Sequence, residues 1–168
     1  MLDRQEGRIL CVSWHSDNVH VVTGSTDTLR VWNTETGQPT ARMVTGRTEK
    51  NKETIVWCVA ITSDMTVISG DSRGKTSFWN GHTGTLMDSI QSHKADVLTL
   101  TLSADETVAY STGVDPTLMH FQVTDIIVLS AHYSSLLVDD FEERWSEEVG
   151  EVSAPSDQLP RCEEHHLC

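Results

Sequence analysis

The sequence has few basic residues, because only twelve lysines and arginines stand against 25 acidic residues, for a formal net charge of −13. Binding to a phosphate backbone depends on clustered lysine and arginine, so this balance argues against general nucleic-acid binding while leaving room for a local basic patch. No apolar run approaches the roughly 18 to 20 residues of a membrane helix, and the start lacks the apolar core of a secretion signal. We therefore expect a soluble, intracellular protein that binds no membrane.

Cysteine is also scarce, with four scattered residues at positions 11, 58, 162 and 168. These are too few for a disulfide scaffold, and Cys11 and Cys58 each occupy the third place of an apolar run, which predicts small buried side chains. The final segment "CEEHHLC" (162–168) holds zinc-binding residue types. Four ligands this close together would strain a tetrahedral site, so we expect an unstructured end and no metal.

The sequence also contains few combinations of residues that could form a catalytic site. His15 lies beside Ser16 and Asp17, but neighbouring residues of a turn point in different directions and give no triad geometry. The segment "GDSRGK" (70–75) lacks the glycine spacing of a phosphate-binding loop. We expect no catalytic residue, no cofactor and no small-molecule substrate.

What the sequence does contain is a pattern that occurs three times, at 8–37, 55–84 and 97–123. The first two copies match at a spacing of 47 residues, and the third follows at about 41. Three pairs of landmarks share the first spacing: Val12 and Val59, Asp17 and Asp64, Trp32 and Trp79. Such a period is typical of a propeller blade.

Each copy reads as short β-type runs separated by polar turns. The predicted strands are 8–14, 19–23, 28–32 and 38–44; then 55–61, 66–70, 75–79 and 85–90; then 97–102, 107–111, 117–123 and 125–130. The sequence therefore predicts an all-β fold, a partial propeller of about three four-stranded blades. We expect these blades at 8–44, 55–90 and 97–130, within one domain, 1–130.

The remaining residues, 131–168, differ in composition. Residues 126–168 contain ten acidic and two basic residues, so they carry −8 of the net charge. Within them, 134–149 permits one amphipathic helix, but the acidic composition is equally compatible with disorder. We expect an acidic, poorly ordered C-terminal tail.

The loop 45–54, which contains Arg47, Lys50 and Lys52, is expected to be solvated, with partner binding as the alternative.

The segments "VTGSTDTLRVWN" (22–33) and "VISGDSRGKTSFWN" (67–80) and the run "HKADV" (93–97) resemble the WD-repeat pattern. In that family a histidine, a turn aspartate, a strand serine or threonine and the tryptophan form a buried hydrogen-bonded tetrad. The resemblance implies these structural candidates: Asp27, Trp32, Trp79, His93 and Asp115. The second and third copies depart from the pattern, because Asp71 comes too early and Phe121 replaces the tryptophan.

A narrower resemblance covers about residues 3–123. "DRQEGRILCVSWH" and "IVWCVAITSDMTVISGDSRGKTSFWNGHTG" are similar to the cirhin family, WD-repeat subunits of the U3 small nucleolar ribonucleoprotein. The resemblance implies a scaffold in the nucleus and nucleolus that binds other small-subunit processome proteins. It also implies indirect association with U3 small nucleolar RNA and with the ribosomal RNA precursor during ribosome biogenesis. A WD-repeat adaptor of a ubiquitin ligase or signalling complex remains the alternative, since blade patterns are shared across functions.

A three-blade fragment would leave two broad apolar faces uncovered, because each propeller blade is normally packed between two neighbours. We therefore expect the isolated chain to associate or to need a partner. Trp14 and Trp57 lie in apolar runs, so we expect both in the core. Arg30, Arg73 and Lys75 are expected to be solvated.

Overall fold

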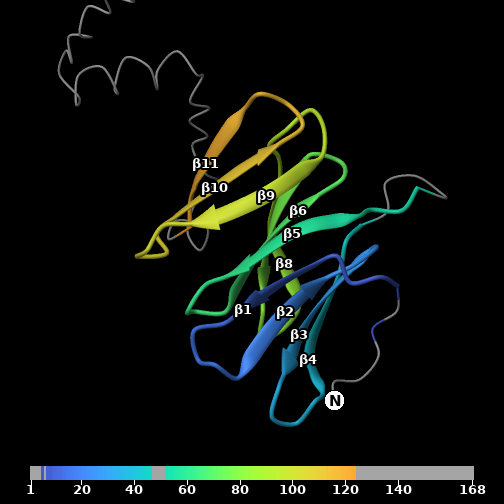
Figure 1. Cartoon of the computed structure of the whole chain (residues 1–168), viewed down its shortest axis with the longest axis vertical. Helices are drawn as coiled ribbons and strands as arrows, with labels where there is room; N and C mark the ends of the chain where they lie inside the picture. Colours follow the sequence, from blue (N-terminus) through green and yellow to red (C-terminus); the bar gives the residue numbers. More distant parts are fainter. Residues whose placement is uncertain (1–4, 6, 47–51, 124–168) are drawn as a thin grey trace, which may run out of the picture.

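In the computed structural model, the residues described are 5, 7–46 and 52–123, and all of their regular structure is β-strand. Three antiparallel sheets lie one after another along the long axis (Figure 1). The expectation of an all-β WD-repeat fold is confirmed. Within the described part of the chain no helix is long and apolar enough to cross a membrane.

The three sheets follow the three copies of the repeat, and we call them blades 1, 2 and 3. Blade 1 consists of β1 (Cys11–Trp14), β2 (His20–Gly24), β3 (Thr28–Asn33) and β4 (Pro39–Val44). Blade 2 consists of β5 (Val56–Ile61), β6 (Thr66–Asp71), β7 (Lys75–Asn80) and β8 (Thr85–Gln91). Blade 3 consists of β9 (Val97–Leu102), β10 (Val108–Gly113) and β11 (Leu118–Gln122). The strand predicted at 125–130, the optional helix at 134–149 and the acidic tail lie outside the described residues.

An aspartate defines the turn between the first two strands of every blade. Asp17 Oδ1 accepts from the backbone N–H of Val19 at 2.8 Å, and the corresponding oxygens of Asp64 and Asp105 accept from Thr66 and Thr107 at 3.1 and 3.2 Å. The residue directly after the aspartate has a positive φ in each turn: Asn18, Met65 and Glu106. The side chain substitutes for a backbone acceptor in these tight turns, which is why the aspartate recurs.

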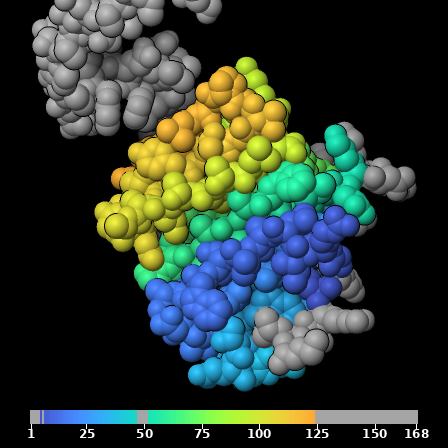
Figure 2. Space-filling model, in the orientation of Figure 1, coloured from blue at the N-terminus to red at the C-terminus, as the bar shows by residue number. Residues whose placement is uncertain are grey.

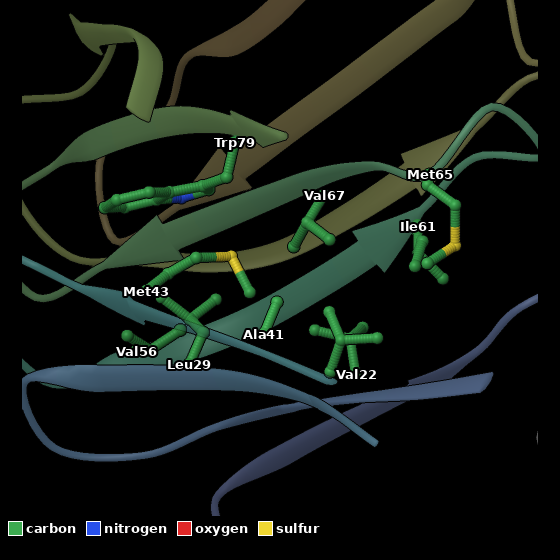
Figure 3. Close-up of a cluster of buried hydrophobic side chains, with 10 residues drawn as sticks. Val22, Leu29, Ala41, Met43, Val56, Ile61, Met65, Val67 and Trp79 are labelled. Atoms are coloured by element: carbon green, nitrogen blue, oxygen red, sulfur yellow. The ribbon is translucent and has the colours of Figure 1, made fainter. Parts of the chain in front are cut away.

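The cores lie between blades. Val22, Val31 and Met43 from blade 1 meet Val67 and Trp79 from blade 2 in one buried cluster, whose side chains Figure 3 shows facing each other across the gap between the sheets. A second cluster joins blades 2 and 3. Each blade is therefore stabilised chiefly by its neighbour.

The junction between blades repeats a small set of contacts. Cys11 Sγ donates to Val56 O at 3.5 Å, and Cys58 Sγ donates to Val97 O at 3.6 Å, so each thiol bridges to the first strand of the next blade. Cys58 is buried and Cys11 is half-buried, close to the expectation for both. Burial raises the pKa of Cys11 to about 11 and that of Cys58 to about 12, so both thiols stay protonated at neutral pH.

The expectation that Trp14 lies in the core is wrong. Trp14 is 56% exposed, whereas Ile61, at the same position of blade 2, is only 6% exposed because it packs against blade 1. Trp57 is half-buried, and its indole N–H donates to Asp96 Oδ2 at 2.8 Å. An apolar run thus predicts the strand correctly, but burial of a blade's outer face depends on a neighbour that is not part of that run.

Candidate functional site: a buried polar frame and two charged rims

The repeat tryptophans are held by hydroxyl groups. Trp32 Nε1–H donates to Thr23 Oγ1 at 2.8 Å, and Trp79 Nε1–H donates to Ser69 Oγ at 2.9 Å. Both bonds are buried and both join the second strand of a blade to the third. A buried indole N–H needs an acceptor, so the tryptophan and the hydroxyl fix the register of these strands together.

Blade 3 holds the histidine part of the expected tetrad. His93 Nδ1 lies 2.6 Å from Asp115 Oδ1, and His93 Nε2 lies 2.9 Å from Ser111 Oγ. Phe121 occupies the tryptophan position and packs edge-on against Phe78 of blade 2, with ring centroids 5.6 Å apart. Burial pushes the pKa of Asp115 upward, but hydrogen bonds from the Lys94 backbone and from His93 hold it below its ordinary value.

The order serine, histidine, aspartate is also that of a hydrolase triad, but its surroundings differ. Ser111 is 1% exposed and His93 is 2% exposed, so the serine hydroxyl has no open approach for a substrate carbonyl. A nucleophile must reach the bond that it attacks. This arrangement therefore favours a fixed structural bond network over catalysis.

Asp27 lies at the junction between blades 1 and 2. Its carboxylate accepts from the Thr54 backbone N–H at 2.7 Å, and its own N–H donates to Thr54 O at 2.7 Å. In blade 2, Asp71 instead accepts from the backbone of Arg73 and Lys75 at 2.8 and 3.0 Å. The tetrad candidates are thus distributed over different contacts, and we propose a structural role for each of them.

Sequence reasoning missed one member of this frame. Thr23 Oγ1, which accepts from Trp32, donates to Gln5 Oε1 at 2.6 Å. Gln5 precedes Lys52 by 47 residues, and Lys52 precedes His93 by 41, the same spacings that relate the three copies. The repeat spacing, rather than residue type, was the signal that could have identified Gln5.

The two ends of the blades differ in charge, because the basic side chains of the turns gather at one end, together with acids such as Asp71 and Asp96. At the end where each blade connects to the next, four basic side chains line a groove of about 680 Å³; we call Lys52, Arg73, Lys75 and Lys94 the cationic rim. The turns at the opposite end carry Asp17, Glu35, Asp64, Asp105 and Glu106, which we call the anionic rim. Among the described residues, those opposite turns contain no lysine or arginine.

The basic side chains are less free than the sequence indicates. Arg30, Arg73 and Lys75, expected to be solvated, are all half-buried. The Arg30 guanidinium lies 5.6 Å from the ring centre of Trp32, and Arg73 Nη2 donates to Lys52 O at 2.7 Å. These contacts hold Arg30 against its blade and Arg73 at the rim, where it fixes one side of the groove. Arg47 and Lys50 lie outside the described residues.

Blade 1 lies at one end of the row of blades (Figure 2), and its strand β1 carries exposed apolar side chains. Val12 is 64% exposed and Trp14 is 56% exposed on β1. The equivalent residues of blade 2, Val59 and Ile61, pack against the core shared with blade 1. The repeat therefore assigns this face to contact with a preceding sheet.

Comparison with known proteins agrees with the repeat. Residues 2–33 match the family "WD domain, G-beta repeat". The chain is 38% identical over 128 residues to the human U3 small nucleolar RNA-associated protein 4 homolog, across 74% of this chain and 18% of that protein. It is 36% and 33% identical to U3 small nucleolar RNA-associated protein 4 of Schizosaccharomyces pombe and Saccharomyces cerevisiae, over 68% and 72% of this chain and 16% of each relative. The chain thus spans less than a fifth of the length of these curated relatives.

Proposed function

From the similarity of this WD-repeat chain to the U3 small nucleolar RNA-associated protein 4 sequences, we propose that it is a member of their family and a non-enzymatic scaffold. In this proposal it binds other proteins of the small-subunit processome in the nucleolus and supports processing of the precursor of 18S ribosomal RNA. Its association with U3 small nucleolar RNA is indirect, through those proteins.

The separation of a buried polar frame from exposed charged rims carries this proposal. The polar groups of the repeat are used inside the blades, as in the bonds of Trp32, Trp79 and His93. Exposed charges such as those of Lys52, Lys94, Asp17 and Glu35 instead lie in loops and turns at the two ends of the sheets. Turns on a fixed frame are suited to binding partners without any bond-making step.

The cationic rim is the surface that we assign to partner binding. Three of its side chains, those of Lys52, Arg73 and Lys94, come from loops that the blade junctions hold in place. Of the nearby acids, Asp96 accepts from Trp57 and Asp115 contacts His93, so part of the local negative charge is engaged. A groove of this charge fits an acidic stretch of a partner protein, because complementary charges favour and orient association.

The experiment is affinity purification of the tagged chain from cells, comparing wild type with the double variant Lys52→Glu and Lys94→Glu. A matched control, Glu35→Lys and Glu106→Lys, changes the same number of charges on the anionic rim. We expect the wild type and the control to recover processome proteins in the nucleolus, and the cationic-rim variant to recover several-fold less. A diffuse cytoplasmic pool without processome proteins, or recovery of ubiquitin-ligase subunits instead, would overturn the proposal.

A further inference from the structure

Two histidines and one aspartate converge in the turn that joins β1 to β2, on the anionic rim. His15 Nδ1 lies 3.0 Å from Asp17 Oδ1, and His20 Nδ1 lies 2.6 Å from Asp17 Oδ2. One ligand-type atom from each of the three residues lies within 4.8 Å of the other two. We propose that His15, Asp17 and His20 form a binding site for a zinc ion, a role that goes beyond the scaffold function.

The distances suit zinc. Zinc binds imidazole nitrogen and carboxylate oxygen at about 2.0 to 2.2 Å, so neighbouring ligand atoms in a tetrahedral site lie about 3.3 to 3.5 Å apart. The two measured separations join His15 and His20 to different oxygens of Asp17, and at 3.0 and 2.6 Å they fall roughly 0.3 and 0.7 Å below this range. To admit the ion, the side chains must rotate outward, and coordination must replace the hydrogen bond between His20 and Asp17.

The orientation of His15 is fixed by blade 2. His15 is only 5% exposed, and its Nε2 lies 3.3 Å from the carbonyl oxygen of Ser63. Donation from Nε2–H to that carbonyl makes Nδ1 the acceptor nitrogen, and its lone pair accepts from the Asp17 backbone N–H at 3.2 Å, so zinc would replace that hydrogen bond. Metal-binding histidines are commonly oriented by such a bond from the second ring nitrogen to a backbone carbonyl.

Asp17 is also held in place. Its Oδ1 accepts from the backbone N–H groups of Val19 and His20 at 2.8 and 2.9 Å, which leaves Oδ2 facing the His20 ring. Two imidazole nitrogens with one carboxylate argue against calcium and magnesium, which prefer sites built entirely from oxygen ligands, and suit a first-row transition metal such as zinc. The donor set therefore selects the class of metal.

The fourth coordination position opens into a groove of about 430 Å³ between blades 1 and 2. His15, Asp17 and His20 line one side of this groove, and Asp64 and His82 of blade 2 line the other. In the proposed site, water or the His82 side chain would complete the tetrahedron there. A bound ion would fix the His15 ring in its contact with Ser63 of blade 2 and so stabilise the fold.

The test uses the purified full chain, freed of metal and titrated with Zn²⁺ by calorimetry, and separately with Co²⁺, whose visible d–d absorption reports tetrahedral nitrogen and oxygen ligands. We expect one ion per chain with micromolar affinity and a rise in the midpoint of thermal unfolding. His20→Gln should weaken Zn²⁺ binding about tenfold or more and abolish that rise. His120→Gln, a change in blade 3 outside the site, should leave both unchanged.

A second variant excludes the other ligand-rich segment of the chain. Replacing Cys162, His165, His166 and Cys168 by serine or glutamine should preserve the binding. Circular dichroism tests whether His20→Gln is folded. If that variant is not folded, the Co²⁺ spectrum of Asp17→Asn gives an independent measure of metal binding. The proposal is overturned if the wild type fails to bind Zn²⁺ below about 100 μM, or if binding follows the C-terminal residues instead. Because the measurement needs no processome, its failure is distinct from failure of the scaffold function.

Discussion

At the scale of single residues, hydroxyl groups determine how the buried tryptophans are held. Ser69 accepts from Trp79, and Thr23 both accepts from Trp32 and donates to Gln5. An indole N–H that loses its acceptor inside the protein has no water to replace it. The small polar side chain is therefore as important to the frame as the tryptophan that names the repeat.

Ser69→Ala tests this dependence. It removes the acceptor of the buried Trp79 N–H, so we expect the free energy of unfolding to fall by about 1 to 3 kcal/mol. The measurement is urea denaturation, with Ser16→Ala as control, because Ser16 is an exposed turn residue. Equal stability of the two variants would contradict the role assigned to the hydroxyl.

Asp115 makes stability depend on pH. Burial raises its pKa, but bonds from Lys94 and His93 lower it further, so the net pKa in the folded chain is below the ordinary value of about 3.9. A lowered folded pKa contributes stability that is fully present above the unfolded value and is lost as pH falls through the folded value. Asp115→Asn should therefore be less stable than wild type at neutral pH, with the gap narrowing below about pH 4. Denaturation curves that keep a constant gap down to pH 3 would contradict this expectation.

At the scale of elements, the junction between blades depends on the absence of a side chain. A Cβ atom placed on Gly70 would lie 2.6 Å from Cys58 Sγ and 2.6 Å from Val97 Cγ1, and one on Gly24 would meet Cys11 and Val56 in the same way. The glycine lets the first strand of the next blade approach closely. This contact recurs at both junctions, so it is a property of the repeat.

Gly70→Ala should open the junction between blades 2 and 3. The added methyl group meets the Val97 side chain close to its Cβ, which has little room to move, so we expect a loss of about 1 to 3 kcal/mol in unfolding free energy. Gly46→Ala is the matched control, because a Cβ there meets nothing within 4 Å. Chemical denaturation of both variants compares their unfolding free energies. A loss of stability in Gly46→Ala alone would contradict the role assigned to Gly70.

The strands were predictable because local pattern specifies them. The predicted run 55–61 became Val56–Ile61, and 75–79 became Lys75–Asn80, since turn residues end each run on both sides. The first run, 8–14, shortened to Cys11–Trp14. The convergence of His15 and His20 on Asp17 was not predicted, because it depends on how a tight turn folds back and on a contact with another blade.

At the scale of the whole molecule, the distribution of charge matters more than its total. The net charge of −13 argued against general binding to a phosphate backbone but left room for a local basic patch, and Lys52, Arg73, Lys75 and Lys94 gather around one groove. In each blade the turn between the second and third strands lies at the same end as the connection to the next blade, while the first and third turns lie at the other end. The lysines and arginines of the turns therefore gather at one end, next to acids such as Asp71 and Asp96, and the other end carries acids without lysine or arginine in the described residues. Composition could not reveal this separation, because it contains no information about which turns share an end.

The exposed face of blade 1 leads to a prediction about Trp14→Lys, a substitution that should be favourable in this chain and unfavourable in a longer protein. Val12 and Trp14 occupy positions that blades 2 and 3 bury against the preceding blade, as Leu100 and Leu102 show. In this 168-residue chain Trp14→Lys should reduce self-association in sedimentation velocity, because it removes exposed apolar surface. Leu86→Lys, a change at a similarly exposed residue of β8, should reduce it less, since the equivalent residue of blade 1, Pro39, is also exposed.

The same substitution should have the opposite effect in a longer protein that supplies a preceding blade. There Trp14 would be packed as Ile61 is packed here, and a buried lysine in its place should cost about 3 kcal/mol or more of unfolding free energy. Thermal unfolding of both lengths, each with and without Trp14→Lys, measures the reversal. A neutral effect in the longer protein would show that this face is not a blade interface.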